Sequence, residues 1–358
     1  MHLQLSTLAI AASVLAHPAV ALSAQDIPTD QPVSDLLASA QSYLSQGLTS
    51  EALPYFDAAI TRDPSNYLSV FKRATTYLSL GRTAQATDDY NKVLKLKPGF
   101  EGAHLQLAKI KAKVADWAGA RSEYLRANRS EDGPEIAELD EAFGAAKLAD
   151  EAEKAGEWEQ CVTNAGVAII VATRSPTLRE SRAHCRFERG EIEEGMGDLQ
   201  HVLHLKPGDI TPHVLISATS FYGLGDLDNG LSQVKKCLHS DPDSKVCKAL
   251  HKQEKAVQKG YKKAVGQLQK GQPTTAGRTL VGTSEDQGLL GTIQAQVERL
   301  RSDGHIPPKA RFRLYEELIE LTCQAYFEVS CGPYFYSKHY WYWIFPLRFC
   351  LLCLRMSS

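Results

Sequence analysis

The sequence lacks the short patterns that mark the common enzyme classes. It contains no glycine-rich phosphate loop, no His-Glu-x-x-His motif and no Gly-x-Ser-x-Gly nucleophile turn. Its 40 basic and 42 acidic side chains give a formal net charge of −2, whereas a nucleic-acid-binding domain is usually clearly basic. We therefore predict no catalytic residue, no cofactor and no nucleic-acid partner.

Cysteine is also scarce for a chain of this length. Eight cysteines in 358 residues are too few for a fold that depends on a disulfide scaffold. Cys350 and Cys353 have the spacing of a metal or redox pair, but no second pair accompanies them. His201, His204 and His213 show no helical spacing with carboxylates, so we predict no metal site.

The amino-terminal segment differs in composition from the rest of the chain. Leu3 to Val20 is largely apolar, and Ala19-Val20-Ala21 places small residues where a signal peptidase reads them. We predict a signal peptide over residues 1–24, although no lysine or arginine precedes the apolar run. The alternative is a buried N-terminal helix, which Pro18 disfavours.

The other end of the chain is aromatic-rich and shows no repeat positions. The apolar run from Trp341 to Leu354 is interrupted by Pro346 and Arg348 and is shorter than the ~20 residues that a membrane helix needs. We interpret residues 329–358 as an anomalous tail, such as translated intron or frameshifted sequence. A tail anchor is the alternative. Because the apolar run is short and interrupted, we do not expect association with a membrane.

A single period organises the region between these ends. Matching positions recur every 34 residues: Ala40, Ala74 and Ala108; Phe56, Tyr90 and Tyr124; Tyr43 and Tyr77; Gly47 and Gly81; Ala52 and Ala86; Pro64 and Pro98. This is the length of the tetratricopeptide repeat, a helix–turn–helix unit. The sequence therefore predicts an all-α tetratricopeptide-repeat (TPR) superhelical solenoid.

Each repeated position has a physical role in such a unit. A small residue at Ala40 and its counterparts lets the two helices of one repeat touch, and the aromatic residues cover the seam between repeats. Gly47 and Gly81 end the first helix, where a positive φ is convenient. Pro64 and Pro98 stop the second helix, because proline cannot continue it.

The period divides the chain into segments. Block 1, residues 33–130, holds three repeats, a joint occupies 131–141 around Gly133-Pro134, and block 2, residues 142–243, holds three more. Ala149, Ala183 and Ala218 mark the second block, with one residue inserted before the last of them. Residues 244–328 are predicted to form a long helix followed by a partial third block.

The long helix is amphipathic. Lysines recur at steps of three and four, at 245, 248, 252, 255, 259 and 262, opposite Val246, Leu250, Val257, Tyr261 and Leu268. The lysine stripe fits a solvated helix face, and an anion-binding face is the alternative. Gln272-Pro273 ends the helix.

Two further features concern covalent chemistry. Asn128-Arg129-Ser130 is a sequon, so Asn128 is a candidate glycosylation site if the chain enters the secretory pathway. Cys237 and Cys247 flank a turn that brings two helix ends together, so a disulfide is geometrically possible. The alternative is a pair of small core residues.

Several segments go beyond the generic repeat positions and resemble one family. They are Cys185-Arg-Phe-Glu-Arg-Gly190, Tyr222-Gly-Leu-Gly-Asp226, Cys237 to Cys247, Leu314-Tyr-Glu-Glu-Leu318 and Thr322-Cys-Gln-Ala-Tyr326. Together they resemble the TPR-containing DnaJ-type co-chaperones of the endoplasmic reticulum, the protein-kinase-inhibitor type in its fungal form. The resemblance extends from the N-terminus to about Glu328.

The resemblance implies a protein of the endoplasmic reticulum lumen that holds unfolded clients in its repeats and passes them to the lumenal Hsp70. It also implies a disulfide between Cys237 and Cys247. A J domain stimulates Hsp70 through a His-Pro-Asp triplet, which these 358 residues do not contain. We therefore expect a form truncated before the J domain, in which client binding survives and Hsp70 stimulation does not.

The first helix of each repeat lines the concave side of a TPR solenoid. The residues expected there in block 1 are apolar and suit an extended hydrophobic peptide: Leu37, Leu44, Leu68, Phe71, Leu78 and Leu105. The alternative is that half of them pack between repeats. Basic residues for a carboxylate clamp, which would mark a cytosolic adaptor, are missing at these register positions, where only Lys72 is basic.

Two other functional classes use the same fold. A scaffold or adaptor for a lumenal or membrane complex would bind one folded partner stoichiometrically instead of many unfolded clients. An enzyme is disfavoured, because no catalytic constellation is present. We predict a client-binding co-chaperone and keep the scaffold as the alternative.

Overall fold

The computed structural model describes residues 27–28 and 30–331, and within these residues every regular element is helical. The predicted all-α repeat fold is therefore confirmed. The predicted signal peptide and residues 332–358 of the predicted tail lie outside the described residues. The described residues form two compact units: those up to residue 112 together with 116–137, and 113–115 together with those from residue 138 onward.

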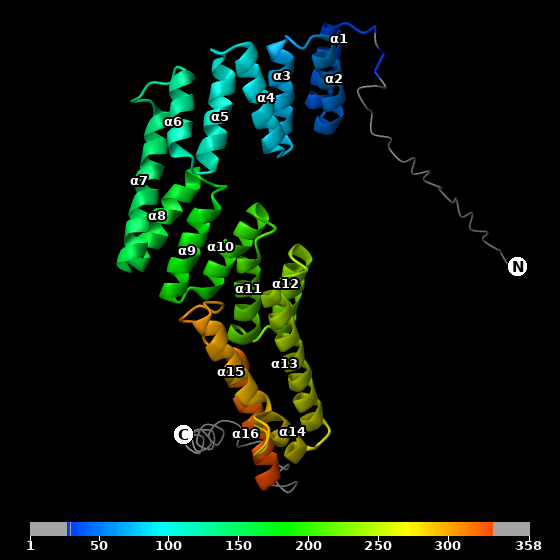
Figure 1. The fold of residues 1–358 in the computed structure, drawn as a ribbon, viewed down its shortest axis with the longest axis vertical. Coiled ribbons are helices and arrows are strands. Elements are labelled where there is room, and N and C mark those ends of the chain that lie inside the picture. The colour runs from blue at the N-terminus through cyan, green and yellow to red at the C-terminus, as the bar shows by residue number, and fades with distance from the viewer. Residues whose placement is uncertain (1–26, 29, 332–358) are drawn as a thin grey trace, which may run out of the picture. The chain divides into compact units, whose positions relative to one another are not determined.

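The helices follow one another as hairpins (Figure 1). The first unit contains α1 Val33–Ser45, α2 Thr49–Arg62, α3 Tyr67–Ser79, α4 Thr83–Leu96, α5 Glu101–Lys113 and α6 Trp117–Arg126. The chain continues with α7 Pro134–Ala155, α8 Trp158–Val171, α9 Pro176–Arg189, α10 Ile192–Leu205, α11 Ile210–Ala218, the π-helical turn η2 Thr219–Gly223, α12 Leu227–Ser240, α13 Lys245–Gln269, α14 Pro273–Val281, α15 Gly288–Ser302 and α16 Arg313–Cys331. Helix α16 thus extends three residues into the segment predicted as tail.

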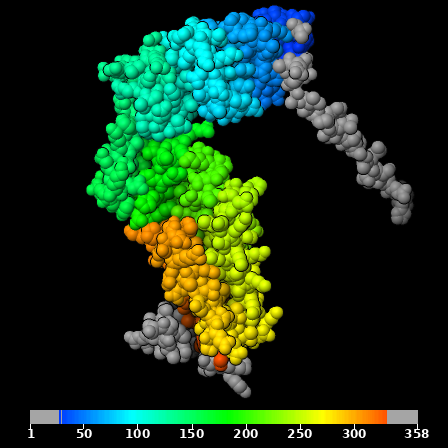
Figure 2. All heavy atoms as spheres, in the orientation of Figure 1, coloured from blue at the N-terminus to red at the C-terminus, as the bar shows by residue number. Residues whose placement is uncertain are grey.

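The repeated small and aromatic residues are buried where the helices touch. Ala40, Ala74 and Ala108 have no exposed surface, and neither do Phe56 and Tyr90. Helix α1 packs against α2, and α3 packs against α4. In the space-filling view the coloured helices of the first unit form a closely packed block (Figure 2). The 34-residue period therefore reflects one recurring helix–helix contact.

The turn inside each repeat needs a left-handed residue. Gly47 and Gly81 have φ values of 77° and 73°, as the sequence predicted. The third repeat has Ala115 at this position, with a φ of 65°. A Cβ in this conformation costs about 1–2 kcal/mol, so the third turn is held by the packing around it.

Ion pairs connect the helices of the first unit. The Arg73 guanidinium donates to both carboxylate oxygens of Asp89 at 2.7 Å and to Asp57 Oδ1 at 2.7 Å. The bonds to Asp89 are the main reason why the pKa of Arg73 is raised above its usual value, although its burial acts in the opposite direction. This network ties α3 to α4 and to the preceding repeat.

The third repeat also pairs an acid on its second helix with cationic side chains on its first, but it uses other residues. Glu123 is buried on α6 and accepts from Lys111 Nζ at 2.8 Å, while His104 Nδ1 lies 2.6 Å from its second oxygen. Burial alone would raise the pKa of Glu123. The hydrogen bonds from Lys111 and His104 outweigh it, so the pKa of this carboxyl is lowered.

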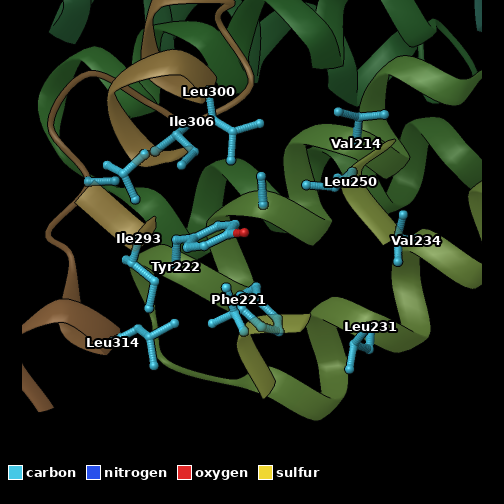
Figure 3. Close-up of a cluster of buried hydrophobic side chains, with 14 of the residues drawn as sticks. Val214, Phe221, Tyr222, Leu231, Val234, Leu250, Ile293, Leu300, Ile306 and Leu314 are labelled. Atoms are coloured by element: carbon cyan, nitrogen blue, oxygen red, sulfur yellow. The ribbon is translucent and has the colours of Figure 1, made fainter. Parts of the chain in front are cut away.

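The largest core lies in the second unit, where α15 and α16 pack against the π-helical turn (Figure 3). Phe221 and Tyr222 are fully buried there, beside Ile293 and Leu314. The Tyr222 hydroxyl donates to Gln296 Oε1 at 2.8 Å. Residues of α15 and α16 therefore complete the core of the sixth repeat.

Helix α13 extends over 25 residues and carries the lysine stripe on its exposed side. Leu250, Val257 and Leu268 are buried as the pattern predicted. Val246 is 43% exposed, so its assignment to the apolar face was wrong. The neighbouring Cys247 takes that inward position in the first turn of the helix, where α12 packs against α13.

Glu254 is the only acidic residue on α13, and its side chain is completely buried. Burial raises its pKa from 4.5 to about 8. Oε1 of Glu254 lies 2.9 Å from Ser217 Oγ, which lies 2.7 Å from the carbonyl oxygen of Gly230. A hydroxyl has one hydrogen, so a protonated Glu254 can donate to Ser217 while Ser217 donates to Gly230.

Two disulfides join neighbouring helices of the second unit. Cys237 on α12 is bonded to Cys247 on α13, with their Cα atoms 6.1 Å apart. Cys161 on α8 is bonded to Cys185 on α9, with a Cα separation of 6.2 Å, and the sequence analysis missed this pair. All four side chains are completely buried. Cys323 on α16 takes part in neither of these two bonds.

The first prediction concerns Glu254 and pH. Its folded pKa of about 8 exceeds the ordinary 4.5, so the folded state holds the proton more tightly than the unfolded state. The free energy of unfolding should fall by about 2–3 kcal/mol between pH 5.5 and pH 8, measured by urea denaturation. Glu254→Gln, which keeps a donor for Ser217, should remove this component of the pH profile. Parallel profiles for the two proteins would contradict it.

The second prediction concerns the disulfides. Peptide mapping without reductant should recover Cys161 with Cys185 and Cys237 with Cys247 as linked species. Changing Cys161 and Cys185 together to alanine should lower the unfolding free energy by about 3 kcal/mol, because the loop they close disappears from the unfolded state. Recovery of four free thiols from protein isolated from an oxidising compartment would contradict the pairing.

Candidate functional site

The six apolar residues predicted to bind a peptide lie on the first helices of three consecutive repeats. Leu37 and Leu44 are on α1, Leu68, Phe71 and Leu78 are on α3, and Leu105 is on α5. All six belong to the first compact unit. The structure thus distributes them over successive repeats, as an extended ligand would require.

Their exposure is not uniform. Leu68 is 44% exposed, whereas the other five side chains are half-buried. Leu37 and Leu44 pack against the cluster of Ala40, Ala52 and Phe56. These leucines therefore support the repeat with one side and reach the surface with the other.

Phe71 has the strongest structural role of the six. Its ring centroid lies 5.0 Å from that of Phe100 in an edge-to-face contact and 5.7 Å from that of Tyr90. Leu78 packs against the same cluster around Tyr90. A substitution of Phe71 would thus disturb the seam between repeats as well as any ligand, and Leu68 is the cleaner residue for a functional test.

The six side chains form a row of apolar area along α1, α3 and α5. The row is held on a rigid helical frame, and the neighbouring charge of Arg73 is neutralised by Asp57 and Asp89. Burying a half-exposed leucine stabilises a complex by about 1 kcal/mol, so several such side chains must act together. The surface therefore fits a ligand that spans more than one repeat.

The candidate glycosylation site lies at the end of α6. Asn128 is exposed, with a φ of 54°, and its Nδ2 donates to Glu101 Oε1 at 2.6 Å. An exposed asparagine just after a helix is sterically open to modification. Glycosylation replaces one of the two hydrogens on Nδ2, so the hydrogen bond to Glu101 can then be made only by the other one.

A further feature is a group of side chains of the types that bind metal ions. Within the described ranges, one group of three potential ligands comes together, Glu153, Cys161 and Cys185. Its two sulfurs are joined in a disulfide, and Glu153 accepts from Ser181 and lies 2.8 Å from His184 Nδ1. This group is therefore part of the helix packing. None of the helices in the described part of the chain is long and apolar enough to cross a bilayer.

Comparison with known proteins also identifies tetratricopeptide repeats in this chain. The tetratricopeptide-repeat family profile matches residues 37–99. The chain is 64% identical over 330 residues to the tetratricopeptide repeat and J domain-containing co-chaperone DNJ1 of Fusarium oxysporum f. sp. lycopersici, covering 92% of this chain and 63% of the relative. A protein of the same description from Cryptococcus neoformans var. grubii is 31% identical over 184 residues, which are 49% of this chain and 34% of that one.

Among solved structures, the crystal structure of the P58(IPK) TPR domain superposes with a TM-score of 0.69. The two share 25% sequence identity, and the match covers 91% of this chain and 84% of that one. The chain spans less than two thirds of the length of the curated relatives it matches. It is a tetratricopeptide-repeat protein and a homologue of the fungal co-chaperones that combine these repeats with a J domain.

Proposed function

We propose that this chain binds unfolded client polypeptides through the first helices of block 1, as a co-chaperone of the endoplasmic reticulum lumen. The observation that carries the proposal is the row of apolar side chains on α1, α3 and α5, with Leu68 exposed at its centre. Unfolded chains expose apolar side chains in extended segments, which such a row can bind.

The lumenal address rests on separate features of the chain. Residues 1–24 have the composition of a signal peptide, Asn128 is an exposed sequon residue, and two buried disulfides suit an oxidising compartment. The relatives' description as co-chaperones with J domains suggests that the clients are shared with an Hsp70, here the lumenal one.

A scaffold for a folded lumenal or membrane complex is the second candidate. It would use the same helices, because stacked repeats offer an extended surface to folded partners as well. The two functions differ in selectivity. A scaffold binds one folded protein stoichiometrically, whereas a client-binding protein suppresses the aggregation of many denatured ones.

The third prediction tests the apolar row. Leu68→Asp places a charge in the centre of the row, and we expect the affinity for a denatured model protein to fall about tenfold. The measurement is suppression of aggregation as a function of chain concentration, with no Hsp70 present. Leu96→Asp is the matched control, because Leu96 is 41% exposed but lies at the end of α4, the second helix of its repeat.

Circular dichroism and urea denaturation must show that both variants remain folded. Equal suppression by the wild-type chain and a folded Leu68→Asp variant would remove the apolar row from the proposal. Binding of a single folded partner in place of denatured proteins would favour the scaffold.

The fourth prediction tests the lumenal address. When the chain is expressed in a fungal cell, a glycosidase should increase its electrophoretic mobility, and Asn128→Gln should abolish this shift. Recovery of the full-length, unglycosylated chain from the cytosol would overturn the assignment.

A further inference from the structure

Three arginines of the second unit share one carboxylate. Arg179, Arg182 and Arg186 lie on successive turns of α9 and face Asp198 on α10, which is 2% exposed. The Arg182 Nε donates to Oδ2 at 2.8 Å, Arg186 Nη1 donates to the same oxygen at 2.6 Å, and Arg179 Nη1 lies 3.5 Å from Oδ1. One negative charge is thus surrounded by three positive ones.

The first unit contains a counterpart of the Arg182–Asp198 pair, with one arginine and a second acid. Arg182 and Asp198 each lie 109 residues after their counterparts Arg73 and Asp89. The residue 109 positions after Asp57, the second acid at Arg73, is Gly166 on α8. An ideal Cβ at Gly166 would lie 3.8 Å from Arg182 Nη1, so this glycine occupies the corresponding place in space as well. The Arg182 Nη1 therefore lacks the carboxylate that Arg73 Nη1 has at 2.7 Å.

The arginines border a cavity of about 360 Å³ between α9 and α10. His201 and His204 of α10 also line it, and Glu194 is the one acid besides Asp198 in its lining. Glu191 Oε2 approaches Arg186 Nε to 4.0 Å. The Nε atoms of Arg179 and Arg186 are buried and have no hydrogen-bond partner. The lining residues therefore carry three positive charges against two negative ones.

We propose that this cavity binds a compact oxyanion, a carboxylate or a phosphate, through the guanidinium groups of the three arginines that line it. Guanidinium groups match the planar, two-oxygen edge of such anions and form charge-assisted hydrogen bonds with them. The ligand would supply the second negative charge that Asp57 supplies in the first unit, but it would do so from the α9–α10 cavity, whose lining does not include Gly166. The anion comes either from a free ion or from an acidic side chain of a bound polypeptide. The site is separate from the apolar row of α1, α3 and α5 and does not depend on the proposed client binding.

The fifth prediction uses inorganic phosphate as the probe for the folded full chain. Titration calorimetry should show saturable binding at constant ionic strength, with chloride as the competing salt. The Nε–H resonances of Arg179 and Arg186 should shift in the NMR spectrum as phosphate binds. Hexaglutamate in place of phosphate distinguishes the sources. Tighter binding of the peptide indicates an acidic polypeptide as the ligand, and tighter binding of phosphate indicates a free ion.

Gly166→Asp is the decisive variant, because it supplies Arg182 with the carboxylate that Asp57 gives Arg73. Phosphate affinity should fall about tenfold, while the unfolding free energy is maintained or increased. Gly144→Asp, on α7, introduces the same charge where an added Cβ meets no atom within 4 Å, and it should leave phosphate binding unchanged. Arg179→Gln should weaken binding and still leave Asp198 paired with two arginines.

Three results would overturn the proposal. The first is binding of phosphate that does not saturate. The second is an equal loss of affinity in Gly166→Asp and Gly144→Asp, which would indicate a general charge effect. The third is an unchanged affinity in folded Arg179→Gln and Gly166→Asp proteins.

Discussion

Close contact between the two helices of each repeat is the constraint on which the rest of this structure depends. An alanine on the first helix makes the contact possible, and Ala40, Ala74, Ala108, Ala149, Ala183 and Ala218 are almost completely buried. A larger side chain here would separate the helices and break the packing of the aromatic residues behind them. Because the contact recurs, the chain can extend without a single large core.

Buried charges form a second layer of contacts between the same helices. The second helix of several repeats carries an acid at one position, Asp89, Glu123 and Asp198, and the first helix supplies the cations. Such pairs are costly to bury unless every partner is present. Where the partners are unbalanced, as around Asp198, the excess charge becomes available to a ligand. The same structural position can therefore support the fold in one repeat and bind an anion in another.

The surface chemistry of the repeats differs from one helix to another. On α1, α3 and α5 the row of side chains is apolar, on α9 three basic residues border the cavity, and on α13 an exposed lysine stripe lies opposite the buried Glu254. Because Leu68 and the lysines of the stripe are exposed, these residues can differ between repeats at little cost in stability. This freedom lets one fold present several kinds of binding surface.

The sequence by itself determined the fold class and much of the local structure. The 34-residue period located the small residues at helix contacts, and Gly47 and Gly81 marked turns that require positive φ. These features are visible because each depends on the type of one residue at a fixed place in a local unit. The six apolar residues of the candidate site were also named from this register, and their role in binding stays a prediction.

Only the tertiary structure decided which distant residues meet. The Cys161–Cys185 bond, the burial of Glu254 inside a lysine-rich helix and the three arginines around Asp198 all depend on the rotation of one helix against its neighbours. Phe71 shows the same limit, since its position on the first helix was predictable but its contact with Phe100 was not. Periodicity fixes which face of a helix is buried, whereas the atoms that face it are fixed by the packing of the adjoining repeat.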